Sequence, residues 1–378
     1  MPEMTEKIFL YNALPCENNT FFLHQIFKFF EKNNYPIVST AETSDTIIIS
    51  TCIVTQEVED KCKSLIAALQ KKFGTNKRFI IYGCLATLKR ATDGKNGMIF
   101  IPPHDLDVFN GLFQHTIPIE QINENVYSRA FSNEPRDIYR VLIAQGCVHN
   151  CSYCAIKSAK GRLKSKKPAR IMSEIKKGAK LGYRHFKLVA DDCGCYGMDL
   201  GTGLGVLLDR ICGLGIAMRL DIHYIEPGSF LRYFRQIERA VAKGLLKDMN
   251  VPIQTTSRRI LKLMNRRYEI EKVMEAVSCL KKNHPVFIST DIIAGFPSET
   301  RDDFHDTLSK TQIFDKTGIF LFSPRTHTPA SKFNRQLSRS EMDYRAKIAS
   351  ELEEKDPKRY QFSVKYDENL AGKNPTAR

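Results

Sequence analysis

The segment Gly146-Cys147-Val148-His149-Asn150-Cys151-Ser152-Tyr153-Cys154 carries three cysteines and directly follows an apolar stretch, residues 141–144. Its spacing lets one loop present three thiolates to one metal group. Three thiolates can bind three irons of a cubane iron–sulfur cluster and leave the fourth iron open, whereas a four-cysteine ferredoxin site has no such vacancy. Zinc is the alternative, although it usually takes four nitrogen or sulfur ligands. The segment therefore predicts an iron–sulfur redox enzyme.

Short apolar stretches alternate with helical ones on the C-terminal side of this loop. Strands are expected at residues 141–144, 186–190, 219–223, 250–253, 286–292 and 319–322, separated by helical stretches such as 173–181, 204–212 and 271–281. This alternation predicts a parallel sheet with helices on its faces. Six such units predict an α/β fold of the partial (β/α)6 TIM type, with its chemistry at the carboxyl ends of the strands.

The N-terminal part shows the same alternation and three further cysteines. Strands expected at residues 8–11, 46–49 and 78–82 lead to Cys16, Cys52 and Cys84, with helices near residues 20–32 and 56–72. Because the carboxyl ends of parallel strands share one edge of a sheet, the three cysteines are expected to converge there. We predict a parallel α/β sandwich domain over residues 1–125, the barrel over 136–335, and a C-terminal helix and tail over 336–378.

The formal net charge of +15 is concentrated between residues 157 and 187, where twelve Lys or Arg accompany one acid, Glu174. Such a surface attracts phosphate-rich or acidic partners, although a merely solvated helical face is an equal alternative. The sequence has neither a long apolar span nor a signal-peptide pattern, so we expect a cytoplasmic protein without a membrane partner. Eleven cysteines in such a chain favour metal ligation or catalysis over structural disulfides.

Together these residues resemble a known family. A CxxxCxxC loop after a barrel strand is similar to the signature of radical S-adenosylmethionine enzymes, and Tyr153 matches their frequent aromatic residue before the last cysteine. More narrowly, residues 7–332 resemble the methylthiotransferases of that superfamily. The segments that match, in the family's order, are Asn12 with Cys16, 50–52 with Glu57, 83–86, Gly161-Arg162 with Ser165, 190–197, 251–254, 264–267, 291–300, 323–325 and 328–330.

The resemblance implies two [4Fe-4S] clusters and S-adenosylmethionine as cofactors. It places one cluster on Cys147, Cys151 and Cys154, where S-adenosylmethionine would be reduced, and an auxiliary, sulfur-carrying cluster on Cys16, Cys52 and Cys84. Both clusters would face one cavity that holds the target carbon between them, away from water. An electron donor such as flavodoxin or ferredoxin is implied as a partner.

Further residues are candidates for binding S-adenosylmethionine or the substrate. The resemblance places Asp191 and Asp192 near the amino group of S-adenosylmethionine, with a turn-capping role as the alternative. Gln254 is expected at a strand end as a hydrogen-bonding group or as a satisfied polar residue. Arg162 could pair with a carboxylate or belong to the basic surface. Gly295 would let the backbone approach an adenine closely.

The remaining cysteines and one histidine are expected to have structural roles. The cysteines interpreted as small buried apolar residues are Cys62, Cys193, Cys195, Cys212 and Cys279. His149, between two ligands, is interpreted as an ordinary loop residue.

Family members usually carry a C-terminal TRAM β-barrel, and this sequence has only about fifty residues after Ala330. We therefore expect the methylthio group to be inserted into an unactivated C–H bond of a polypeptide side chain, such as an aspartate of a ribosomal protein or of a precursor peptide. The alternative substrate is the tRNA adenosine beside the anticodon, which the positive charge favours. An alternative of another class is a non-catalytic iron–sulfur or zinc protein that binds RNA.

Overall fold

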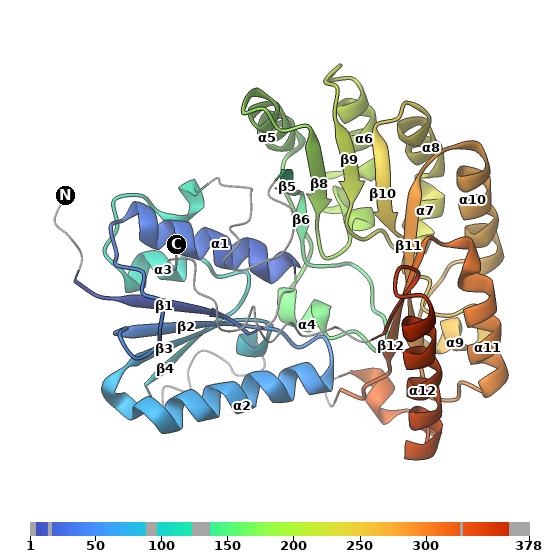
Figure 1. The fold of residues 1–378 in the computed structure, drawn as a ribbon. Coiled ribbons are helices and arrows are strands. Elements are labelled where there is room, and N and C mark those ends of the chain that lie inside the picture. Colours follow the sequence, from blue (N-terminus) through green and yellow to red (C-terminus); the bar gives the residue numbers. More distant parts are fainter. Residues whose placement is uncertain (1–4, 14–16, 88–96, 123–136, 326–327, 363–378) are drawn as a thin grey trace. The chain divides into compact units, whose positions relative to one another are not determined.

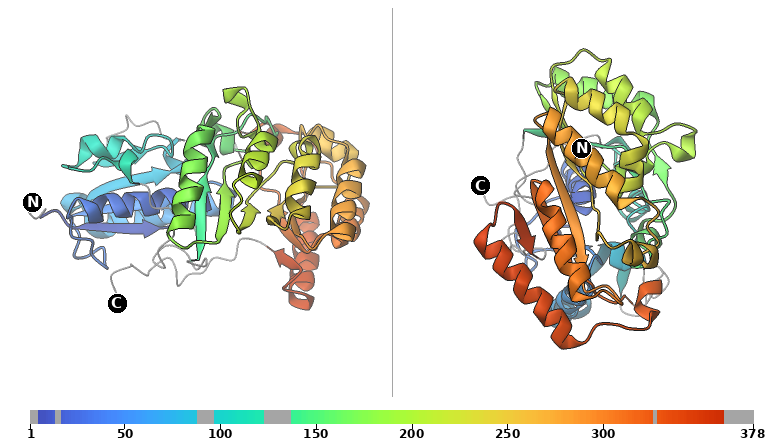
Figure 2. Two further views of the ribbon diagram at one scale, coloured as in Figure 1. Left: turned by 90° about the horizontal axis from the view of Figure 1, so that it is seen from above. Right: turned by 90° about the vertical axis from the view of Figure 1, so that its right-hand side faces the viewer.

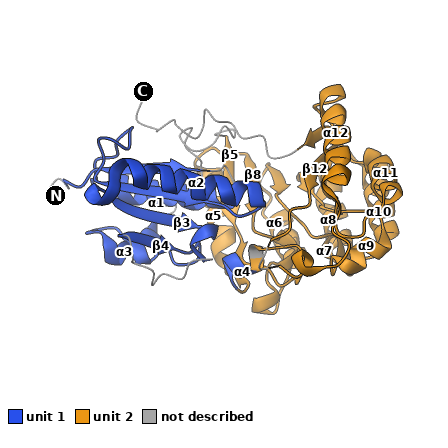
Figure 3. Ribbon diagram, turned by 90° about the horizontal axis from the view of Figure 1, so that it is seen from below, with its two compact units in different colours: residues 1–136, 158–161, 366–378 blue, residues 137–157, 162–365 orange. Residues whose placement is uncertain are grey.

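The computed structural model describes residues 5–13, 17–87, 97–122, 137–325 and 328–362. The chain forms two compact units (Figure 3). Unit 1 comprises residues 1–136, 158–161 and 366–378, and unit 2 comprises residues 137–157 and 162–365. In the parts of the chain that the structure describes, no helix has the length and apolar character needed to cross a membrane.

Unit 1 is built on a four-stranded parallel sheet in the order β1-β2-β3-β4 (Figure 1). Its elements are β1 (Ile8–Asn12), α1 (Glu17–Lys32), β2 (Thr46–Thr51), α2 (Gln56–Phe73), η1 (Gly74–Asn76), β3 (Arg78–Gly83), η2 (Cys84–Thr87), β4 (Met98–Ile101), α3 (Val108–Leu112) and η4 (Ile119–Gln121). The three predicted strands and two predicted helices are present. The short strand β4 is an addition that the sequence analysis missed.

An aromatic cluster attaches the end of unit 1 to helix α1. The ring of Phe30 packs edge-on against Phe113, with 4.8 Å between ring centroids, and against Phe109 at 6.2 Å. The Asn33 side chain accepts the backbone N–H groups of Thr116 at 2.8 Å and Ile117 at 3.0 Å. Buried aromatic contacts and satisfied backbone groups therefore fix residues up to 122 on this unit.

Unit 2 is built on a seven-stranded parallel sheet in the order β13-β12-β11-β10-β9-β8-β5. Its strands are β5 (Ile138–Leu142), β8 (His185–Val189), β9 (Arg219–Ile222), β10 (Leu246–Asn250), β11 (Phe287–Ala294), β12 (Lys316–Leu321) and β13 (Tyr360–Phe362), and a small antiparallel pair is formed by β6 (Ala144–Gln145) and β7 (Lys164–Ser165). The predicted α/β fold with a TIM-type parallel barrel is confirmed. β13 is a seventh strand in a segment predicted to be a tail.

Helices cover one face of this sheet (Figures 1 and 2). They are α5 (Pro168–Lys180), α6 (Leu204–Cys212), α7 (Pro227–Arg232), α8 (Phe234–Ala242), α9 (Arg258–Leu263), α10 (Ile270–Asn283), α11 (Arg301–Lys310) and α12 (Arg339–Lys355), with the 3₁₀ turns η5 (Cys193–Cys195), η6 (Met198–Leu200), η7 (Thr311–Ile313) and η8 (Pro329–Lys332). The short helix α4 (Ile156–Lys160) follows the cysteine loop, and its last three residues belong to unit 1. Alternation of strand and helix thus persists through the whole unit.

A buried ion pair joins α12 to the rest of unit 2. The Nε of Arg345 donates to Oε2 of Glu299 at 2.7 Å, and both side chains are almost inaccessible, at 0% and 2% exposure. The same carboxylate accepts the N–H of Gly295 at 2.7 Å. The guanidinium also lies over the ring of Phe304. Because each charge is paired and hydrogen-bonded, the contact can hold α12 in place despite the cost of desolvation.

Candidate functional site

The loop that carries Cys147, Cys151 and Cys154 is anchored at its start by β6, which pairs with β7, and by Gly146. Gly146 has a φ of 79°, in the left-handed region that favours glycine, and its N–H donates to Oδ2 of Asp191 at 2.8 Å. The side chains of the three cysteines are half-buried. A strand end and one carboxylate thus fix the point where the loop leaves the sheet.

Backbone bonds hold the middle of this loop against the end of α9. Ser152 donates its N–H to the carbonyl of Met264 at 3.0 Å and its hydroxyl to the carbonyl of Leu263 at 2.8 Å. Ser152 also accepts the N–H of Ala330 at 2.9 Å, and the Asn265 side chain donates to the Asn150 carbonyl at 2.8 Å. The loop is therefore ordered by its own unit, and its three thiols project from a fixed backbone.

Tyr153 is anchored by an arginine. Its ring lies at the edge of a cluster with Ile260, Met264, Phe296, Phe322, Ala330 and Phe333. Its hydroxyl accepts Nε of Arg266 at 3.1 Å and Nη2 at 2.7 Å, and Nη1 of Arg266 lies 3.5 Å from Oε1 of Glu226. Burial raises the pKa of the Tyr153 hydroxyl well above its ordinary value, so this group is a neutral phenol. The cysteine loop is thus tied to a charged, largely buried guanidinium.

The two predicted acids, Asp191 and Asp192, follow β8, and both contact their own backbone surroundings. Asp191 accepts from Gly146, as described above. Asp192 is buried, and its Oδ1 accepts the N–H groups of Gly194 at 2.8 Å and Glu226 at 3.0 Å. The turn-capping alternative therefore describes part of what Asp192 does. Binding of the amino group of S-adenosylmethionine by these acids stays a prediction.

Oδ2 of Asp192 lies among groups that the sequence analysis did not bring together. It accepts the Cys195 thiol at 2.8 Å and lies 3.0 Å from Nε2 of His149. The ligand atoms of Cys147, His149, Asp192 and Cys195 all lie within 4.8 Å of one another. Cys195 is buried as predicted, but it is a polar partner rather than a mere space-filling residue, and His149 is more than an ordinary loop residue. The adjacency of β5 and β8 was the signal, because it brings the segments that follow these strands together.

The charges in this cluster act on one another. Burial opposes a charge on His149, but the hydrogen bond and charge of Asp192 outweigh burial and raise the pKa of the imidazole. The same hydrogen bond, together with that from Cys195, lowers the pKa of the buried Asp192 carboxyl. The Cys195 thiol also lowers the pKa of Cys147 by donating to its sulfur, while its own pKa is raised. Its one proton can serve either Asp192 or Cys147.

Gln254 is predicted to contact the nucleoside or substrate. It is buried and has a φ of 65°, in the left-handed region that is uncommon for residues other than glycine. Its backbone is bonded to β11 on both sides, since its N–H donates to Asp291 at 2.9 Å and its carbonyl accepts from Ile293 at 2.9 Å. Its side chain lies 3.4 Å from the Pro252 carbonyl. These bonds account for its place in the fold, and its ligand role stays a prediction.

Two further candidates, Gly295 and Arg162, lie in different settings. Gly295 has a φ of 85°, and a Cβ added there would meet Sδ of Met342 at 2.4 Å. Close approach of α12 therefore explains this glycine, and its proposed contact with an adenine stays a prediction. Arg162 is exposed within the basic stretch. Its predicted carboxylate contact likewise stays a prediction.

In unit 1, Cys52 and Cys84 follow neighbouring strands. Thr51 at the end of β2 is the register partner of Gly83 at the end of β3. Gly83 has a φ of 108°, and a Cβ there would meet the Thr51 carbonyl at 2.4 Å. This close approach sets the two buried cysteines at one edge of the sheet. Cys16 lies outside the described residues, so convergence of all three cysteines stays a prediction.

Cys62 on α2 is a fourth thiol near this edge. It is buried, and its Sγ lies 3.7 Å from the carbonyl oxygen of Cys52. Burial raises its pKa to about 11, so it is a protonated thiol. None of the ten cysteines that the structure describes forms a disulfide bond; Cys193 is buried as predicted, whereas Cys212 is only half-buried and Cys279 is exposed.

Family models match both units. The radical SAM superfamily matches residues 141–311, and a family described as uncharacterized protein family UPF0004 matches residues 9–97. By overall fold, the chain is similar to a radical S-adenosylmethionine methyltransferase from Kitasatospora setae, with a TM-score of 0.58, 14% identity, and coverage of 86% of this chain and 75% of that one. This likeness supports the fold alone.

Curated relatives match most of the chain. It is 32% identical to a tRNA-2-methylthio-N(6)-dimethylallyladenosine synthase from Thermosipho melanesiensis, over 82% of this chain and 74% of the relative. It is 30% identical to a protein of the same description from Clostridium botulinum, over 96% and 88%. A probable threonylcarbamoyladenosine tRNA methylthiotransferase from Pyrococcus horikoshii is 28% identical, over 80% and 73%.

These matches favour a radical enzyme over the alternative of a non-catalytic metal protein. Methylthiotransferases of this type use S-adenosylmethionine and two [4Fe-4S] clusters. The chain belongs to the radical S-adenosylmethionine methylthiotransferase family.

Proposed function

We propose that this enzyme transfers a methylthio group to an adenosine of tRNA. The relatives carry the proposal, because three that match most of the chain are described as acting on tRNA. The short segment after Ala330 by itself favours a polypeptide substrate. Extensive similarity to tRNA-modifying enzymes outweighs that argument, so the alternative becomes the main hypothesis and a polypeptide the second candidate.

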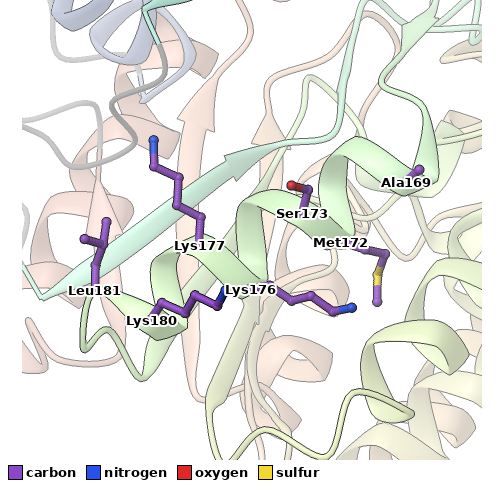
Figure 4. A pocket seen from close by; sticks show the side chains of 7 residues that line it. All are labelled: Ala169, Met172, Ser173, Lys176, Lys177, Lys180 and Leu181. Carbon is purple, nitrogen blue, oxygen red and sulfur yellow. The ribbon is translucent and has the colours of Figure 1, made fainter.

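The surface of α5 favours an RNA substrate. Side chains of Ala169, Met172, Ser173, Lys176, Lys177, Lys180 and Leu181 line a surface pocket from which the lysines project (Figure 4). The one acid of the basic stretch, Glu174, is bound by Lys166 at 2.8 Å. Among the described residues, none places a carboxylate within ion-pair distance of these three lysines. Exposed cations without acid partners are suited to binding phosphates and releasing counterions.

The two cysteine sets fit the cofactors of the family. Cys147, Cys151 and Cys154 are half-buried thiols on a fixed loop and would hold the cluster to which S-adenosylmethionine would bind. Cys52 and Cys84, with Cys16, would hold the auxiliary cluster. When bound, the first cluster would supply the electron for cleavage of S-adenosylmethionine. An external donor such as flavodoxin or ferredoxin would provide that electron.

The chain's own contribution is positioning. Arg266, through Tyr153, and Asp191, through Gly146, fix the two ends of the loop. Such fixation keeps the thiols in one arrangement before any cofactor binds and reduces the entropy lost on binding. The interaction of α5 with phosphates would act on substrate affinity rather than on the chemical step.

Mass spectrometry of nucleosides tests the substrate. A strain lacking the gene is compared with strains complemented by the wild type or by C147A/C151A/C154A. We expect the wild type alone to add CH2S to a tRNA adenosine. Tryptic peptides from the same cells are searched for the same gain. A modified peptide together with unchanged tRNA would replace the proposal with the polypeptide alternative.

Salt dependence tests the role of α5. The variant K176Q/K177Q/K180Q is compared with K61Q/K72Q/K310Q, in which the same charge is removed from lysines paired with acids. The logarithm of the association constant for tRNA falls linearly with the logarithm of the salt concentration, and each phosphate contact contributes about 0.7 to 0.9 to the steepness of this fall. We therefore expect the α5 variant to make the slope shallower by about 2 to 3. Equal slopes for the two variants would exclude α5 as a phosphate-binding surface.

A further inference from the structure

We propose that the cluster-free protein binds one Zn²⁺ ion through Cys147, His149, Asp192 and Cys195, in competition with cluster assembly. Their ligand atoms already lie within 4.8 Å of one another. The set includes only one of the three cysteines assigned to the radical cluster. The zinc site itself is independent of the substrate, and only its competition with the cluster rests on the proposed cluster ligands.

The separations of the four ligand atoms bracket those of a tetrahedral zinc site. Oδ2 of Asp192 lies 2.8 Å from Sγ of Cys195 and 3.0 Å from Nε2 of His149. Bonds of 2.0–2.3 Å to a tetrahedral zinc place neighbouring ligand atoms about 3.3–3.8 Å apart, so these two close pairs must move slightly apart and the pairs separated by up to 4.8 Å must move together by about 1 Å. Two sulfurs, one imidazole and one carboxylate are a donor set that suits Zn²⁺.

The surroundings hold two of the ligands in place. Asp192 is buried, and the N–H groups of Gly194 and Glu226 hold its Oδ1, which leaves Oδ2 directed at the other ligands. Cys195 is fully buried in the turn that Asp192 caps, and its N–H donates to the Asp192 carbonyl at 3.2 Å. Hydrogen bonds of this kind orient metal ligands and raise affinity.

Binding exchanges protons for the ion without any redox change. The thiols of Cys147 and Cys195 each lose a proton as their sulfurs bind zinc, and His149 binds through the lone pair of neutral Nε2 with its proton on Nδ1. Asp192 is already ionised in this environment. Two thiolates and one carboxylate around Zn²⁺ leave a net charge of −1 on the site, with two protons released to solvent from the thiols and a third from Nε2 of His149 when the imidazole is charged beforehand.

The ligand sets make zinc and the cluster mutually exclusive but separable by mutation. Cys147 belongs to both sets, so it can serve only one metal group at a time. Cys195 belongs to the zinc set alone, and Cys154 belongs to the cluster set alone. Zinc bound here would therefore block the loop from taking up iron and sulfide until the ion is removed.

The experiment uses the full chain, anaerobic and metal-free, with Cys16, Cys52 and Cys84 replaced by alanine to remove the other thiol set. Zinc affinity is measured by competition with a chromophoric chelator, and Co²⁺ provides spectra of sulfur ligation. We expect C195A to weaken zinc binding by at least about 100-fold, more than the loss of an outer-shell partner. C154A should bind zinc as the parent does. H149A, a change in the loop, should also weaken it.

Cluster reconstitution gives the opposite result for the same variants. C195A should take up the iron and sulfide of one cluster, which also shows that it folds, whereas C154A should not. If C154A weakens zinc binding as much as C195A does, zinc is held by the CxxxCxxC loop and the proposal is wrong. Zinc binding that neither C195A nor H149A reduces would also overturn it. None of these outcomes depends on whether tRNA is the substrate.

Discussion

Replacing Arg266 by Met should release the cysteine loop from the rest of unit 2. The change removes both hydrogen bonds to the Tyr153 hydroxyl, at 2.7 and 3.1 Å, and the ion pair to Glu226 at 3.5 Å. The side chains of Arg266 and Glu226 are each only 9% exposed, so water cannot fully replace what is lost.

The magnitude follows from these contacts. A hydrogen bond to a charged group contributes about 1.5–3 kcal/mol, and breaking a buried ion pair by removing one partner costs about 3–5 kcal/mol. Because the contacts share one guanidinium, their costs do not add, and we expect a total loss of about 3–5 kcal/mol. This loss should lower the free energy of opening the cysteine loop.

Native-state hydrogen exchange of the cluster-free protein measures the free energy of opening the cysteine loop. The amide of Ser152 is bonded to Met264 and that of Cys154 to Cys151, so both report opening of the loop. R259Q is the control, because that arginine is half exposed and pairs with Asp303 at the surface, where an ion pair contributes about 1 kcal/mol or less.

A double-mutant cycle isolates the contact with the tyrosine. R266M and Y153F should be coupled by about 1.5–3 kcal/mol, the value of a hydrogen bond to a charged group. Coupling below about 0.5 kcal/mol, within the error of additivity, would refute the view that Arg266 anchors the loop through Tyr153.

Three further changes test other contacts. Burial raises the pKa of Asp291 to about 6, above the 3.8 of an ordinary aspartate. Between about pH 4 and 6 the unfolded chain therefore binds fewer protons than the folded one, and the free energy of unfolding falls as the pH rises. D291N should remove this fall and raise the free energy of unfolding at pH 7, measured in urea, by up to about 3 kcal/mol. R345M leaves Glu299 buried without its partner and should lower the free energy of unfolding by about 3–5 kcal/mol. A decrease below about 1 kcal/mol would show that the pair is dispensable. G83A forces a Cβ against Thr51 and should cost about 2–5 kcal/mol and lower iron content, with unchanged iron counting against the role of this close approach.

The sequence was sufficient for the fold wherever a strand carried a continuous apolar run. β2, whose six residues are all buried, and β3 were placed within two residues of their observed bounds. β10 was predicted at residues 250–253 but lies at Leu246–Asn250. Lys247 and Asp248 make the strand itself polar in sequence, whereas the apolar residues that suggested a strand come just after it. β13 has only three residues, too few for any periodic signal.

The site was predictable as far as its residues lie close in sequence. Cys147, Cys151 and Cys154 share one loop, and their spacing is visible in the chain. The group of His149, Asp192 and Cys195 depends on β5 lying beside β8 and on a 3₁₀ turn after β8, which no local pattern encodes. The roles of Gly295 and Arg345 likewise depend on where α12 packs.

Iron and acid-labile sulfide per chain test the central claim, that two cysteine trios each hold a cubane cluster. The reconstituted wild type should contain about eight irons, and C147A/C151A/C154A and C16A/C52A/C84A about four each. A wild type with only about four irons, or a triple variant that loses none, would contradict the assignment of the six cysteines.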